Sequence, residues 1–191
     1  MKLLALNCPQ CGQRLAPQNE AIVFRCQNCL TAVHLDDHGL QAIAVRYIAP
    51  PPDKQIATWL SVWVFSGSVK ITRRHTQKGR GKRRSIDEAN LFWGSISQFF
   101  VPAWQLDWRE AQSIGSRLIQ AQPEYETYTG DTTQPFMTVV TDGADAQKLL
   151  EFIILSHEAH EKDWLKDLRF TLDLQPPDLW AFPGLGNKLI V

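Results

Sequence analysis

The sequence has little of what membrane-spanning or exported proteins need. Its longest apolar run, residues 56–69, is shorter than the ~20 residues that cross a bilayer as a helix, and it is rich in strand-forming residues. The apolar stretch before Cys8 is also shorter than the roughly 7–15 residues of a signal-peptide core. We therefore expect no transmembrane segment and no export signal. These absences predict a cytoplasmic protein, in which thiols stay reduced.

Signatures of common enzyme classes are missing as well. The sequence contains no G-x-S-x-G, and its only cysteines are the four that lie between residues 8 and 29. The segment GRGKRRS, residues 79–85, lacks the first glycine and the final Ser or Thr of a phosphate-binding loop. These absences favour a protein without catalytic activity.

One histidine pair suggests an enzyme and has to be weighed. His157 and His160 are spaced i, i+3 in the segment HEAH, whereas the metalloprotease pattern places its histidines at i and i+4. No neighbouring motif offers further ligands. We interpret both histidines as residues at the edge of a core, near a helix C-terminus. A metalloenzyme centred on them is the third of three hypotheses.

The chain also lacks a formal net charge at pH 7, but its positive and negative charges are distributed unevenly along the sequence. Residues 70–84, called the basic segment below, hold eight of the twenty Lys and Arg and no acid. The rest of the chain has 12 basic and 20 acidic residues, a net charge of −8. The candidate partner-binding residues are Lys70, Arg73, Arg74, Lys78, Arg80, Lys82, Arg83 and Arg84.

Several partners would suit the basic segment. Phosphates attract Lys and Arg without regard to sequence, so nucleic acid is one candidate. The segment has no interleaved aromatic residues for base stacking, and the acidic remainder would repel a phosphate backbone. A protein partner or complex, or an anionic membrane surface, would use the same charges. The segment could also be a solvated loop that binds nothing.

The four cysteines form the clearest pattern. Cys8, Cys11, Cys26 and Cys29 have the spacing C-x2-C-x14-C-x2-C, in which both thiolates of each pair can turn toward one ion. Gly12 follows the first pair, where a tight turn needs positive φ, but the second pair lacks such a glycine. The spacing predicts a metal site. Zinc is the favoured ion, and iron stays open because its ligands would be the same.

This stretch resembles the zinc-ribbon family with rubredoxin-like knuckles, over residues 6–38 only. The resemblance implies a small β module, residues 1–38, with Cys8, Cys11, Cys26 and Cys29 as ligands. Four thiolates leave no coordination position for water, so we expect a structural Zn²⁺ rather than a catalytic one. Such an ion would let a module fold that is too small to build a sufficient core alone.

The rest of the sequence predicts an α+β fold with a mainly antiparallel sheet. Residues 39–55 read as a short strand and a proline-rich linker, and residues 56–191 as an α+β domain. The apolar segments 57–73 and 90–106 enclose residues 74–89, which contain most of the basic segment, and this predicts a long β-hairpin with a basic tip.

Further elements follow from periodicity and capping. Two helices are predicted, the first starting at Asp107 and weakened by Gly115, at residues 107–122 and 143–165. Two more strands are predicted at residues 135–142 and 169–175.

Together these patterns predict a non-catalytic interaction or assembly protein, an accessory subunit that contacts a macromolecular partner through its zinc ribbon and its basic segment. A nucleic-acid-binding protein that uses the same basic segment is the alternative.

Overall fold

The computed structural model describes residues 6–18, 20–77, 84–159 and 164–190, and it confirms the α+β class. Its helices are α1 (Ile86–Gly94), α2 (Trp108–Ala121) and α3 (Gly143–Ala159). Its strands are β1 (Val23–Arg25), β2 (Ala32–Asp36), β3 (Gly39–Ile43), β4 (Arg46–Tyr47), β5 (Thr58–Gln77), β6 (Gln98–Pro102), β7 (Trp164–Leu174), β8 (Asp178–Leu185) and β9 (Lys188–Leu189). No helix among these residues is long and apolar enough to cross a membrane.

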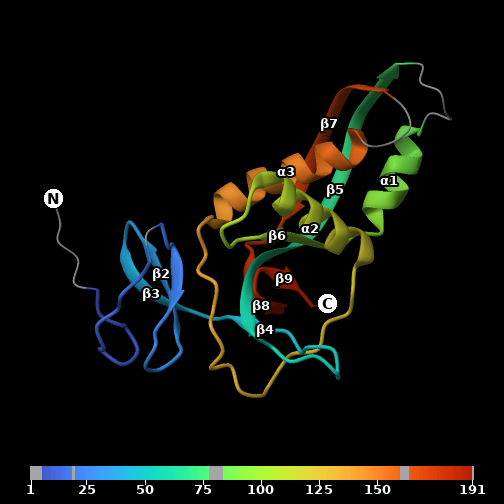
Figure 1. The fold of residues 1–191 in the computed structure, drawn as a ribbon. Helices are drawn as coiled ribbons and strands as arrows, with labels where there is room; N and C mark the ends of the chain where they lie inside the picture. Colours follow the sequence, from blue (N-terminus) through green and yellow to red (C-terminus); the bar gives the residue numbers. More distant parts are fainter. Residues whose placement is uncertain (1–5, 19, 78–83, 160–163, 191) are drawn as a thin grey trace.

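The N-terminal module is a three-stranded antiparallel sheet of order β1-β2-β3 (Figure 1). Its third strand, Gly39–Ile43, is the strand predicted at the start of the 39–55 segment. Because β3 pairs with β2 along its whole length, this sheet runs on to Ile43, beyond the stretch that resembles a zinc ribbon.

The larger sheet is organised around β5, a strand of 20 residues. The order is β4-β8-β5-β6, with β9 added to β8, and β7 pairs with the second half of β5. The first half of β5, from Thr58 to Phe65, is buried on both faces, whereas exposed and buried residues alternate beyond Ser66. The strand therefore begins inside the core and continues as an arm together with β7 (Figure 1).

The predicted second strand of the hairpin, residues 90–106, is wrong in its first half. Residues 86–94 form α1, which starts with a capping box between Ser85 and Glu88. Asn90 of α1 then hydrogen-bonds both backbone groups of Ile71, so the helix covers this edge of β5. Of the predicted second strand, only β6 pairs with β5, at Val62–Ser66, and the distal half of β5 pairs with β7 instead.

Both predicted helices are present. The second is described as far as Ala159, and residues 164 and 165, which the sequence places in this helix, belong to β7 instead. Asp107 caps α2 as expected, and α2 packs on β6 and α3 (Figure 1). Gly115, which the sequence suggests is a weak point, lies at the closest approach. A Cβ there would lie 2.9 Å from the Phe100 carbonyl oxygen and 2.6 Å from Ile153 Cδ1. The glycine lets the three elements meet.

The remaining segments differ in part from the sequence prediction. Residues 135–142 form only isolated bridges, from Phe136 to Trp59 and from Val139 to Val23, because their backbone divides its hydrogen bonds between two sheets. β7 extends the predicted strand 169–175 back to Trp164. β8 lies beyond the last strand predicted from the sequence, and it contains Pro183, a residue that is unfavourable inside a sheet.

Candidate metal centre

The two cysteine pairs sit on knuckles with the same backbone geometry. In the first knuckle, the Gly12 N–H donates to the Cys8 carbonyl at 2.8 Å, and the Cys8 N–H donates to the Gln13 carbonyl at 2.8 Å. In the second, Leu30 and Cys26 repeat the first of these bonds at 2.9 Å, and the Cys26 N–H donates to the Thr31 carbonyl at 2.9 Å. The two knuckles therefore present their thiols in the same way, as metal-binding knuckles do.

Gly12 and Leu30 hold equivalent positions but differ in backbone strain. Gly12 has a φ of 71°, as the sequence predicts, and Leu30 has a φ of 60°. The left-handed region is open to glycine and disfavoured for a residue with a bulky side chain. The missing second glycine therefore does not change the geometry of the knuckle, but it leaves strain at Leu30.

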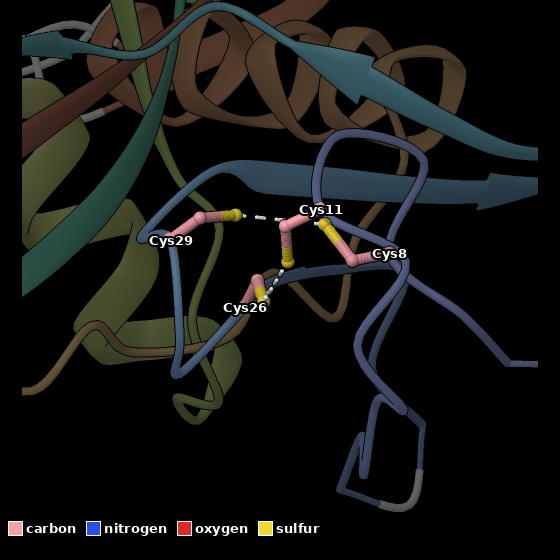
Figure 2. A group of neighbouring side chains, drawn as sticks. All are labelled: Cys8, Cys11, Cys26 and Cys29. Carbon is pink, nitrogen blue, oxygen red and sulfur yellow. Dashed lines mark hydrogen bonds between the residues drawn. The ribbon is translucent and has the colours of Figure 1, made fainter.

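The four sulfur atoms converge from the two knuckles (Figure 2). Cys8 Sγ lies 3.6 Å from Cys29 Sγ, Cys11 Sγ lies 3.7 Å from Cys26 Sγ, and all four lie within 4.8 Å of one another. A zinc ion with bonds of about 2.3 Å to four sulfurs spaces them about 3.8 Å apart in a tetrahedron. All four cysteines are free thiols, so the site could hold a metal ion.

The protein environment treats the thiols differently. Burial raises the pKa of the Cys8 thiol to about 11, whereas hydrogen bonds from the side chain and backbone of Thr31 lower the pKa of Cys29 to about 6. Cys29 Sγ lies 3.3 Å from the Thr31 hydroxyl. Burial therefore favours the form of Cys8 that keeps its proton, whereas Thr31 favours the thiolate form of Cys29. Metal binding at the site would displace that proton.

A small apolar cluster lies beside the thiols. It contains Cys8 and Cys26 together with Leu15, Ala21, Phe24 and Val33. This cluster is separate from the main core. It is too small to stabilise the N-terminal module without further contributions. A metal ion at the four thiols would add stability, and contacts with the larger domain are a second source of it.

The larger domain does contact the module directly. The backbone of Val23 pairs with Val139, and both side chains belong to the main core. Arg25 donates from its guanidinium to the carbonyls of Thr132 and Gln134. In Figure 1 the segment that leads into α3 runs alongside the small sheet. The cysteine module is thus fixed to the α+β domain through β1.

The structure separates the candidate residues of the basic segment. Lys78, Arg80, Lys82 and Arg83 lie outside the described residues. Lys70 and Arg73 are exposed on β5. Arg74 and Arg84, expected in an exposed tip, are instead largely buried, with 1% and 13% of their side chains accessible, and both pair with Glu158 of α3. These two arginines therefore stabilise the fold instead of lying open to a partner.

Glu158 is the residue that sequence reasoning missed. Its carboxylate is fully buried, accepts from Arg74 Nε at 2.7 Å and from Trp93 Nε1 at 2.9 Å, and lies 3.2 Å from an Arg84 nitrogen. The signal was present in the sequence. Ala146, Leu150, Ile154 and Glu158 recur every four residues on the buried stripe of α3, so this acid had to have buried partners.

Among the described residues, the four cysteines are the only group that could hold a metal ion, and His157 is not part of it. His157 stacks on Phe92 at 4.6 Å between ring centroids and meets Trp93 edge-on at 5.2 Å. Its Nδ1 lies 3.1 Å from Gln120 Nε2. His160 lies outside the described residues. The position of His157 agrees with the interpretation of a histidine at the edge of the core.

Comparisons with protein-family models, with curated proteins and with solved structures find no match to the chain. The features of the chain that bear on its function are the four-cysteine cluster, which could hold a metal ion, and the exposed residues around this cluster and along β5.

Proposed function

We propose that the protein is a non-catalytic interaction or assembly protein of the cytoplasm, in which four cysteines hold a structural zinc ion. The observation that supports this most is the convergence of all four thiols within 4.8 Å of one another. Four thiolates fill the tetrahedral shell of zinc, and a filled shell offers no position for substrate or water. The ion would therefore stabilise the fold and take no part in catalysis.

The zinc ion would be held by Cys8 and Cys11 from one knuckle and by Cys26 and Cys29 from the other. When bound, it neutralises thiolate charge and ties the two knuckles together, so the segment between them has to fold. The chain's own residues do the rest. Val23 and Arg25 fix the module to the larger domain, and this sets the direction in which the knuckle tips face.

The proposed contact surfaces are the knuckle tips and the exposed part of the basic segment. The tips carry exposed polar residues such as Gln10, Gln27 and Asn28. Lys70 and Arg73 point outward from β5, and Arg73 forms an exposed pair with Asp167 of β7 at 2.8 Å. Acids beside the cations, and a net charge of −8 outside the basic segment, favour a protein partner over a phosphate backbone.

Affinity purification tests this proposal. The intact zinc-bound protein should retain one or more protein partners after nuclease treatment, and Cys11→Ser should lose those that contact the ribbon. Lys70→Glu with Arg73→Glu should weaken binding mainly through the association rate, whereas Arg109→Glu, a reversal on the exposed face of α2, should leave it unchanged. Retention of nucleic acid alone, with log affinity linear in log salt, would instead identify a nucleic-acid-binding protein.

A further inference from the structure

β7 is an edge strand with one unpaired side. Within the described parts of the chain it pairs with no strand except β5, which lies between β7 and α1 in Figure 1. The continuous stretch of its edge is Leu168–Leu174, because a register shift between His75 and Thr76 interrupts the pairing before it and Pro176 cannot donate after it. Within this stretch one further register shift, between Ile71 and Arg73, places the extra residue on β5, so the residues of β7 itself follow one another without an insertion. A row of open backbone groups is a template for another strand.

The direction of each backbone group on β7 follows from the bonds at its end. The Gln175 N–H donates to the Ser66 carbonyl, and the Gly67 N–H points the other way, to Ser97. Backbone groups of neighbouring residues alternate in direction along an antiparallel strand. The N–H and C=O groups of Leu168, Phe170, Leu172 and Leu174 therefore face the open edge. Their side chains form a partly buried apolar row against the main core.

The outward face of the same strand carries an unresolved charge pattern. Arg169 lies directly opposite Arg73 of β5, and like charges in facing positions are unfavourable. Arg73 takes Asp167 as its partner. Among the described residues no ion pair involves Arg169, nor does one involve Asp173, two pleats further along the same face. β7 thus exposes a positive and a negative side chain that do not form an ion pair with each other within one chain.

We propose that β7 pairs with β7 of a second copy of this chain, antiparallel about a two-fold axis at Thr171. This register brings Arg169 opposite Asp173 of the second copy, and the symmetry forms that pair twice. It also joins Phe170 to Leu172 of the other copy, and Leu168 to Leu174. These apolar residues have the outward backbone groups, so they exchange the hydrogen bonds, and the charged residues fall in the closer non-hydrogen-bonded positions.

Other registers of the two β7 strands also pair their outward-facing backbone groups, but they match the side chains less well. Centring the axis on Phe170 places Asp167 opposite Asp173 of the second copy, and centring it on Arg169 places two arginines opposite each other. Centring it on Leu172 leaves Arg169 opposite Gln175 and shortens the pairing. Only the axis at Thr171 matches charge with charge and continues the apolar row. The dimer depends neither on the metal nor on another partner.

A charge swap tests this pairing in the full-length zinc-bound protein. Sedimentation velocity over a concentration series should show a reversible dimer. Arg169→Asp and Asp173→Arg should each raise the dimer dissociation constant at least about tenfold, because each places two like pairs at the interface. The double variant should return to within a few-fold of the wild-type value. Arg109→Asp on α2 is the control and should leave the dimer unchanged.

Amide hydrogen exchange of the wild type gives a second measurement that needs no variant. Protection of Phe170 and Leu172 should increase with protein concentration, whereas that of Thr171, already bonded to β5, should not. A monomer up to the solubility limit would overturn the proposal. If neither single reversal changes the dimer dissociation constant, the interface lies elsewhere. If the double variant does not regain a dissociation constant near that of the wild type, the register at Thr171 is wrong.

Discussion

Arg74 and Glu158 form a buried ion pair that joins the arm of β5 to α3. Arg74 Nε lies 2.7 Å from Glu158 Oε2, and the two side chains are 1% and 0% exposed. The guanidinium of Arg74 also donates to the backbone carbonyl of Arg84 at 2.8 Å, so one carboxylate holds both flanks of the segment between them. Two residues that the charge pattern assigns to a binding surface are thus part of the interior.

Removing the carboxylate should be costly. Glu158→Gln removes the buried negative charge that Arg74 and Arg84 both contact, and breaking a buried ion pair costs about 3–5 kcal/mol. The free energy of unfolding, measured by denaturant titration, should fall by that order. Glu151→Gln on the exposed face of the same helix should change it by less than about 0.5 kcal/mol. Equal small effects for the two variants would contradict the structural role of Glu158.

The strain at Leu30 predicts a stabilising substitution. Leu30→Gly should stabilise the zinc-bound module by about 0.5–1 kcal/mol, because a left-handed backbone costs a non-glycine residue about 1–2 kcal/mol and glycine loses part of that gain through its freer unfolded state. Gly12→Ala at the matching position should act in the opposite direction. Chelator competition and thermal unfolding would measure both. A loss of stability in Leu30→Gly would show that the leucine side chain matters more than its backbone.

Gly115 and Gly94 make a matched pair of helical glycines. Gly115→Ala should destabilise the protein by about 1–3 kcal/mol, because the new methyl group meets the backbone of Phe100. Gly94→Ala meets nothing within 4 Å and should be neutral or stabilising by up to about 1 kcal/mol. Thermal unfolding of both variants would test the packing of α2. Stabilisation by Gly115→Ala would mean that β6 and α2 lie further apart than described.

Local chemistry made the cysteine site and the helix starts readable from the sequence. The spacing of Cys8, Cys11, Cys26 and Cys29 specifies a knuckle pair by itself, and Asp107 caps α2 as its position indicates. Ser85 and Glu88 were an equally local signal for α1, but the apolar residues after them also fit a strand. Helix and strand compete over short apolar stretches, and the capping box decided this one.

What the sequence could not reveal depends on distant partners. Arg73 of β5 lies in register with Arg169 of β7, which comes much later in the sequence. No local pattern indicates that β7, and not β6, is the neighbour of the distal half of β5. The burial of Arg74 likewise depends on Glu158. Pro183 disfavours a strand locally, yet β8 accommodates it between its neighbours. Non-local pairing and buried charge decide such cases, and neither follows from periodicity.

Metal content shows whether the four cysteines form a structural zinc site. Elemental analysis of the purified wild-type protein should give about one zinc per chain, and no iron absorption, since one set of four thiolates binds one ion. Cys11→Ser and Cys26→Ser should each lose the zinc and the order of the small sheet, while His157→Ala, which removes a histidine outside the cluster, should keep both. A cysteine variant with full zinc content, or a wild-type protein without bound metal, would show that the four cysteines do not hold a structural zinc ion.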